Sequence, residues 1–115
     1  MQKSTEQIII SALLKLGISP NIKGYHYIFK AITISLDTQN PTINFSRQLY
    51  PALADYFHAS SGSVERAIRN AIRSGYAHCD ETFADSIFHN TLQSKYDIPT
   101  NTLFITVLAQ WIKLQ

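Results

Sequence analysis

The segment from Ser60 to Ser74 constrains the fold more strongly than any other part of this chain. Its apolar residues recur at i, i+3, i+4, i+7 and i+8, which is the spacing of one buried stripe on an α-helix. They are Val64, Ala67, Ile68, Ala71 and Ile72. Ser60, Ser61 and Gly62 precede the stripe, and each is an acceptable N-cap residue, so the sequence leaves the choice among them open. The pattern predicts an amphipathic helix over residues 63–74 with one face in the core.

A second face of the same predicted helix carries basic side chains. Arg66, Arg69 and Arg73 recur at i, i+3 and i+7, so they project together, and Glu65 and Asn70 flank them. Arginine can bond bidentately to guanine, asparagine to adenine, and glutamate can accept from cytosine. This combination suits the major groove of double-stranded DNA, whereas the simpler interpretation is a solvated helix face with ion pairs.

The composition is that of one ordinary globular domain over residues 1–115. The chain has 115 residues, of which 45% are hydrophobic and 16% charged. The net charge of +2 is too small to indicate nucleic-acid binding by itself, so the position of the charge has to decide. Residues 60–74 hold three arginines and one glutamate, whereas residues 80–97 hold four acidic residues and one lysine. The predicted basic surface is therefore local.

Cysteine usage and hydropathy indicate the compartment. Cys79 is the only cysteine, so no internal disulfide can form and a reducing compartment fits best. No apolar run has the length of a membrane span, and the first residues lack the apolar core of a secretory signal. We therefore expect a cytoplasmic protein without a membrane partner.

The rest of the chain also has helical periodicity, and strand signals are nearly absent. A first helix is expected to begin at Ser4 or Thr5 and to end at Gly17; if Thr5 is its N-cap, no capping box is present. A second helix is expected from Lys23 or Gly24 to Leu36. A turn over 37–41 follows, then a short helix over 45–48, one from Pro51 through Phe57, and a weaker one over 77–89. The last helix follows Pro99-Thr100-Asn101, with an apolar stripe of Leu103, Phe104, Val107, Leu108, Trp111 and Ile112. The prediction is an all-α fold of about six helices.

Two of these helices form a helix-turn-helix signature at the centre of the chain. The helix that begins near Pro51 would brace the backbone, and the 63–74 helix, ending at Gly75, would be the recognition helix. Near its end, Arg73 is expected to contact phosphate. Ser60 and Ser61 could cap the helix and also donate to phosphate, and Lys23 could contact phosphate or serve only as surface charge. Glu65 would stand at N3 if Gly62 were the N-cap, which offers a capping role instead of a base contact.

Several segments together resemble a known family. They are Ile22–Tyr27, Leu49–Pro51, Ser63–Ile72 and Pro99–Asn101. In this order they resemble the C-terminal effector domain of the sporulation-initiation response regulator. The resemblance implies a six-helix DNA-binding domain that recognises a short promoter box, binds tandem sites as a homodimer and contacts an RNA polymerase sigma factor. It also carries the base-contacting positions onto Glu65, Arg66 and Arg69.

This chain departs from the family pattern at Ser63, where a basic residue is usual, and at Asn70, where histidine is frequent. Both positions are on the predicted exposed side of the recognition helix, so we expect base contacts there and a changed DNA preference. The sequence holds no receiver domain before the effector segment, so it is either an excised effector domain or a stand-alone member, and we expect a stand-alone member. The alternative is a protein-interaction module, or an antagonist, that keeps the fold but binds the intact regulator or RNA polymerase in place of DNA.

Other chemistries have little support in the sequence. His78-Cys79-Asp80 with His89 matches no closed zinc pattern. A glycine-rich phosphate loop, a paired-carboxylate motif and a nucleophile elbow are all missing from the sequence. We therefore expect no metal, no cofactor, no catalytic residue and no enzymatic activity.

Overall fold

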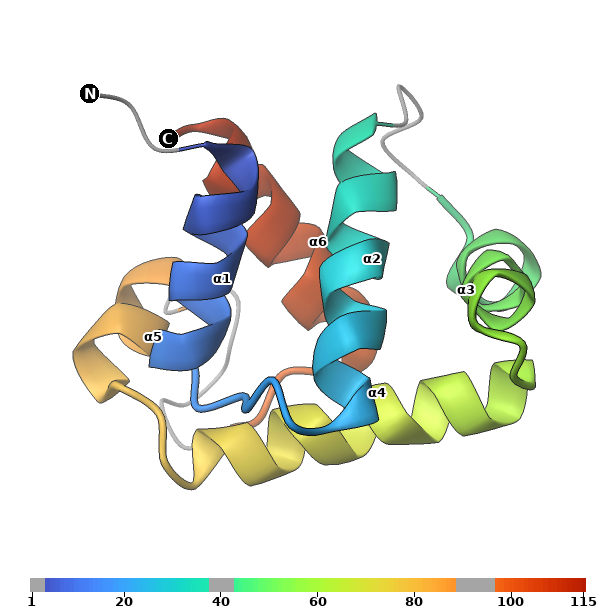
Figure 1. Ribbon diagram of the computed structural model, residues 1–115. Helices are drawn as coiled ribbons and strands as arrows, with labels where there is room; N and C mark the ends of the chain where they lie inside the picture. The colour runs from blue at the N-terminus through green and yellow to red at the C-terminus, as the bar shows by residue number, and fades with distance from the viewer. Residues whose placement is uncertain (1–3, 38–42, 89–96) are drawn as a thin grey trace.

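The computed structural model describes residues 4–37, 43–88 and 97–115 (Figure 1). These residues form six α-helices and one π-helical turn, and no strand occurs among them. The α-helices are α1 (Thr5–Lys15), α2 (Lys23–Asp37), α3 (Tyr50–Phe57), α4 (Ser61–Tyr76), α5 (Glu81–Phe88) and α6 (Asn101–Lys113), with the π-helical turn η1 (Phe45–Leu49) before α3. The prediction of an all-α fold with about six helices is confirmed. The predicted turn at 37–41 lies mostly outside the described residues.

Local signals determine both ends of α1. Ser4 is the N-cap: its side chain accepts from the backbone N–H of Gln7, and the Gln7 side chain accepts from the Ser4 N–H. This is a capping box, so the expectation without one, which took Thr5 as the cap, was wrong. Gly17 has φ +81° and stops the helix as predicted, because its N–H and that of Ile18 bond back to carbonyls of the last turn.

Helix α2 stands at the centre and crosses α4 at its N-terminal end (Figure 1). The crossing is close because Gly24 has no side chain. A Cβ atom there would lie 2.5 Å from the carbonyl oxygen of Ala67 and 2.6 Å from the Cβ of Ala71. Tyr25 and Tyr27 on α2 are buried. The single apolar core thus joins α4 directly to the middle of the molecule.

Gly75 does not stop α4, contrary to the prediction. The helix continues to Tyr76, and Gly75 is buried within it. A Cβ atom at Gly75 would lie 2.7 Å from the carbonyl oxygen of Leu16 and 3.0 Å from Cγ1 of Ile18. The glycine is therefore needed for the close approach of the α1–α2 connection, not for a left-handed cap.

The helix before the central turn begins slightly earlier than expected. Phe45–Leu49 forms the π-helical turn, capped by the side chain of Asn44, where an ordinary short helix was predicted. Helix α3 follows at once from Tyr50, so Pro51 occupies the first turn, where a missing N–H costs nothing. The brace of the predicted helix-turn-helix thus exists and packs against α4.

The last two helices differ from their predicted limits. Helix α5 begins at Glu81 and not at Ala77, because the Asp80 side chain caps it at the Phe83 N–H and the Asp80 N–H bonds to the carbonyl of Lys15. His89 lies outside the described residues. In α6 the most buried face is shifted toward Ile105 and Ala109, whereas Trp111 is only half-buried. Thr100 is the N-cap of α6, so Asn101 is the first residue of the helix and does not precede it.

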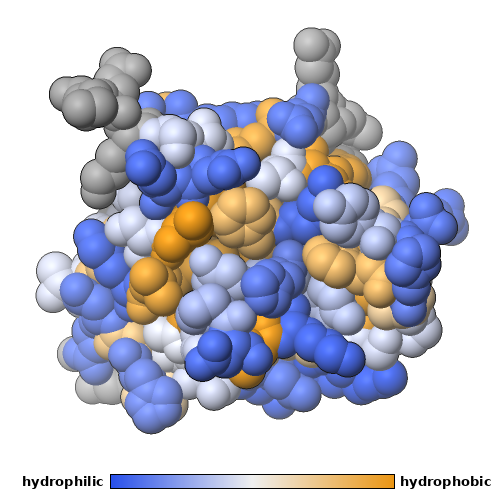
Figure 2. All heavy atoms as spheres, viewed as in Figure 1, coloured by the Kyte–Doolittle hydropathy of each residue, from blue (hydrophilic) through white to orange (hydrophobic). Residues whose placement is uncertain are grey.

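Figure 2 shows the same face of the molecule coloured by hydropathy. Hydrophobic side chains are exposed near its middle, whereas its lower edge, along α4, is mainly hydrophilic. Within the described ranges, no helix is both long enough and apolar enough to cross a membrane.

Candidate nucleic-acid interface

The turn between α3 and α4 is three residues long and is held by a serine cap. His58 adopts a left-handed conformation with φ 55°, and the Ala59 N–H bonds back to the carbonyl of Ala54. Ser60 is the N-cap, because its side chain accepts from the backbone N–H of Ser63 at 3.1 Å. Helix α4 therefore starts at Ser61, two residues before the predicted limit.

This cap changes how two candidate residues are interpreted. The Ser63 hydroxyl donates to the carbonyl of Ser60 at 3.0 Å and accepts from the Ser60 hydroxyl at 2.9 Å, so it belongs to the cap and is half-buried. A base contact by Ser63 stays a prediction. With Ser60 as the N-cap, Glu65 stands at the fifth helical position and not at N3, so the considered capping role for Glu65 was wrong.

Glu65 instead pairs with Arg69 one turn later. Nη1 of Arg69 donates to Oε1 of Glu65 at 2.6 Å, and the side chains are 41% and 32% exposed for Arg69 and Glu65 respectively. Such an exposed i,i+4 pair contributes only about 0.3–0.5 kcal/mol to stability. Its larger effect is geometric, because one carboxylate oxygen holds one end of the guanidinium while the other N–H groups stay free to donate.

Arg66, Asn70 and Arg73 occupy the outermost face of α4, opposite the buried stripe. All three are exposed. The guanidinium of Arg66 lies back over Gly62, since a Cβ atom on that glycine would be 3.2 Å from its Nη1. Helix α4 thus presents two exposed cations and an amide on its outer face, with the Glu65–Arg69 pair beside them.

A groove runs along the Glu65–Arg69 side of α4. The residues from Asp97 to Thr102, where the chain enters α6, also line it, as does Tyr50. Glu65, Arg69 and Arg73 line it together. Arg73 therefore borders both the groove and the outer face of α4, whereas Arg66 and Asn70 lie on the outer face alone.

Asn101 belongs to the lining of this groove and was not among the predicted site residues. Its amide nitrogen donates to the hydroxyl of Tyr50 at 3.1 Å and to the backbone carbonyl of Glu65 at 3.1 Å. Burial raises the pKa of Tyr50, the bond from Asn101 lowers it, and the charge of Glu65 raises it again. The Pro99-Thr100-Asn101 signal located this residue at a helix start, but its contacts with α3 and α4 could not be deduced from the sequence.

Three of the four predicted phosphate contacts lie near the two ends of α4, and the fourth, Lys23, lies on α2. Ser60 is exposed and Ser61 half-exposed at its N-terminus, and Arg73 is exposed in its last turns. Lys23 is exposed at the first position of α2. It adjoins Gly24, which contacts Ala67 and Ala71 on the flank of α4 away from Glu65. None of these placements is in itself evidence of a phosphate contact.

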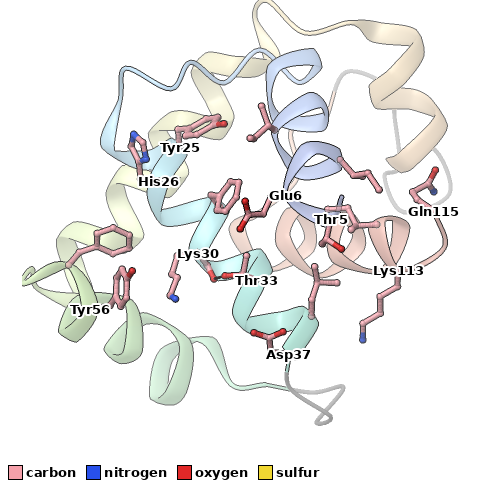
Figure 3. Close-up of a pocket in the computed structure, with 16 residues that line it drawn as sticks. Thr5, Glu6, Tyr25, His26, Lys30, Thr33, Asp37, Tyr56, Lys113 and Gln115 are labelled. Carbon is pink, nitrogen blue, oxygen red and sulfur yellow. Dashed lines mark hydrogen bonds between the residues drawn. The ribbon is translucent and has the colours of Figure 1, made fainter. Parts of the chain in front are cut away.

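Another depression on the surface lies away from this groove. It is formed by α1, α2, α3 and the end of α6, and Figure 3 shows Tyr25, Lys30 and Tyr56 among its lining side chains. Lys30 Nζ lies 4.2 Å from the ring centre of Tyr56, a cation–π contact between α2 and α3. None of the candidate site residues lines this depression.

Metal-binding groupings are not evident in the described ranges. No group of three histidine, cysteine or acidic residues is close enough to hold a metal ion in these parts of the chain. Burial raises the pKa of the Cys79 thiol, which is half-buried.

A comparison with protein families supplies an independent finding. The family model described as "Sporulation initiation factor Spo0A C terminal" matches residues 9–112, which is nearly the whole chain. The match spans both helices of the helix-turn-helix, the Gly24 crossing and the Asn101 network.

Proposed function

Because this chain belongs to the Spo0A C-terminal family, a family of DNA-binding transcription regulators and not of enzymes, we propose that it binds double-stranded DNA sequence-specifically through α4. The observation that carries the proposal is the arrangement on α4. A helix anchored in the core by its apolar stripe presents Arg66, Asn70 and Arg73 outward, with the Glu65–Arg69 pair beside them. This polarity is that of a helix placed in a major groove.

In this proposal the side chains divide into base contacts and phosphate contacts. Arg66 and Arg69 contact guanines, while Glu65 and Asn70 refine the choice of neighbouring bases. Arg73, Lys23, Ser60 and Ser61 contact the backbone and set the orientation of α4. Since the Ser63 hydroxyl is engaged in the cap, we expect it to contribute less to base recognition than its position suggests.

The Glu65–Arg69 pair supports a specific form of base recognition. A carboxylate that holds one N–H of the guanidinium restricts the rotation of a long side chain and so reduces the entropy lost on binding. Glu65 keeps its second oxygen for a cytosine amino group. We therefore expect the pair to act as one unit, in which neither residue can be replaced without altering the contact made by the other.

The test begins with selection of duplexes from a pool with a randomised central segment, followed by anisotropy titration of the enriched duplex at two salt concentrations. Loss of Arg66 or Arg69 is expected to weaken binding by about 1–3 kcal/mol for each bidentate contact. Lys113→Ala is the matched control, because it removes one positive charge at the far end of α6. Wild-type affinity is expected to fall steeply with salt.

Two outcomes would contradict the proposal. Selection could enrich no sequence, or Arg66→Ala and Arg69→Ala could lose no more affinity than Lys113→Ala. Either result would favour the alternative of a protein-interaction module that keeps the fold. Contact with an RNA polymerase sigma factor and homodimerisation on tandem sites, which the family resemblance implies, stay predictions.

A further inference from the structure

We propose that Asn101 is a positioning residue for DNA recognition, which fixes the turn of α4 that carries Glu65 and Arg69. This inference rests on the proposed function and extends it to a buried residue in the lining of the groove beside Glu65 and Arg69. Asn101 would not contact DNA. It would act through the backbone of α4.

The first support is the burial of the Asn101 amide. Asn101 is 8% exposed and is the only buried polar or charged side chain in the described part of the chain. Burying an amide is unfavourable unless its hydrogen bonds are made. Nδ2 has two N–H groups, and the two acceptors at 3.1 Å match that number.

The second support is that the two acceptors belong to different helices. Asn101 is the first residue of α6, Tyr50 is the first residue of α3, and Glu65 lies in the second turn of α4. The contacts are separated by 51 and 36 residues in sequence. One amide therefore connects the bracing helix and the recognition helix to a third helix that lies outside the helix-turn-helix.

The third support is the rigidity of the anchor. The N-terminus of α6 is capped by Thr100, whose side chain accepts from the Leu103 N–H at 3.2 Å. Phe104 and Ile105, which follow in the same turn, are fully buried. Because the start of α6 is held by its cap and by the core, the amide is a fixed reference point for α4.

The contact also reaches the turn of α4 that sets the position of the Glu65–Arg69 pair. It meets the backbone carbonyl of Glu65, the residue whose side chain pairs with Arg69 at 2.6 Å. A small displacement of this turn moves the carboxylate and the guanidinium together. Bidentate base contacts depend on placement to within a fraction of an ångström, whereas phosphate contacts tolerate more movement.

The test compares Asn101→Ala and Asn101→Asp with Ile87→Ala in the full chain. Ile87 is buried in α5, away from α4, so its truncation lowers stability without touching the network. Aspartate is favourable in the first turn of a helix, so it should preserve α6, but its carboxylate cannot donate to the carbonyl of Glu65. Circular dichroism at the assay temperature verifies that each variant is folded.

The readout is the ratio of affinities for the enriched duplex and a random duplex of equal length. Both Asn101 variants are expected to lose about ten-fold in affinity for the enriched duplex, with affinity for the random duplex within about two-fold of wild type and the salt dependence unchanged. If Asn101 only stabilised the fold, the Asn101 variants that remain folded would have the same affinity ratio as the wild type. Retention of the wild-type ratio by Asn101→Ala, or an equal loss in Ile87→Ala, would overturn the proposal.

A second arm needs no DNA. Amide hydrogen exchange over residues 65–70 should become faster in Asn101→Ala relative to residues 71–75, but not in Ile87→Ala. If the wild-type chain binds no duplex, the proposed function fails, and this arm still decides whether Asn101 holds α4. Unchanged exchange over 65–70 would refute the positioning role independently of DNA binding.

Discussion

Gly24→Ala tests whether the closeness of the α2–α4 crossing is required for stability. The added Cβ atom would lie 2.5 Å from the carbonyl oxygen of Ala67 and 2.6 Å from the Cβ of Ala71. Ordinary contacts of this type are about 3.4–4 Å, so the two helices would have to separate. One of the blocking atoms is backbone, which cannot rotate away as the end of a long side chain can.

The expected cost follows from two opposing terms. Replacing glycine by alanine in a helix stabilises the folded state by about 0.5–1 kcal/mol. Overpacking of a close contact costs about 1–3 kcal/mol, and backbone obstruction favours the upper half of that range. We therefore expect Gly24→Ala to lower the free energy of unfolding by about 1–2 kcal/mol, which corresponds to a decrease in Tm of about 4–8 °C.

Gly62→Ala is the matched control, because Gly62 occupies the same second position in α4 that Gly24 occupies in α2. A Cβ atom at Gly62 meets only the guanidinium of Arg66 at 3.2 Å, which can move into solvent. This variant should keep the helical gain and raise Tm by about 2–4 °C.

Thermal unfolding followed by circular dichroism, with urea unfolding as a second measure, gives the difference between the two variants directly. The signs should be opposite. If Gly24→Ala is as stable as wild type, or as stable as Gly62→Ala, the crossing is not sterically limited and the reasoning about α2 and α4 is wrong.

Three further perturbations follow from the local chemistry. Ser60→Ala removes the cap of α4 and should cost about 1 kcal/mol in urea unfolding, whereas Ser61→Ala should change stability by less than about 0.5 kcal/mol; equal effects would contradict the assignment of the cap. Tyr76 has a buried hydroxyl without a hydrogen-bond partner in the described ranges, so Tyr76→Phe should be at least as stable as wild type, and a loss above about 1 kcal/mol would refute this. Burial raises the pKa of Tyr76 above its ordinary value of about 10, so the folded state favours the neutral phenol. Stability is then complete below pH 10 and falls as the pH rises above it, and urea unfolding between pH 9 and 11 should show a smaller fall for Tyr76→Phe. Glu65→Gln should lower stability by no more than about 0.5 kcal/mol but change the enriched duplex sequence in a repeated selection, and an unchanged sequence would argue against a recognition role for the pair.

Signals carried by neighbouring residues were predicted well. The apolar stripe of α4 and the left-handed Gly17 each act within about one helical turn. The caps of α4 and α6 lie within the short segments that the sequence offered, and the structure selects Ser60 and Thr100 from them. Their physical basis is local hydrogen bonding and the 3.6-residue period, so the sequence alone contains the information. The spacing of Arg66, Arg69 and Arg73 on α4 could be predicted for the same reason.

Gly75 shows where local reasoning fails. Glycine near the end of an apolar stripe predicts a helix stop, but here the same residue permits the carbonyl of Leu16 to approach the helix. Both uses exploit the missing Cβ atom, and only the position of another segment distinguishes them. The predicted start of α5 was wrong for a related reason, because the Asp80 N–H bonds to the carbonyl of Lys15 at the end of α1.

The sequence by itself determined an all-α chain and an amphipathic helix that carries three arginines away from its apolar stripe, because helical period and capping are local properties. Only the tertiary structure decided how that helix is held. It placed Glu65 against Arg69, enclosed Ser63 in the cap and brought Asn101 to the backbone of α4 from 36 residues away. Contacts between distant residues depend on how the helices pack, and no spacing within a single segment encodes them.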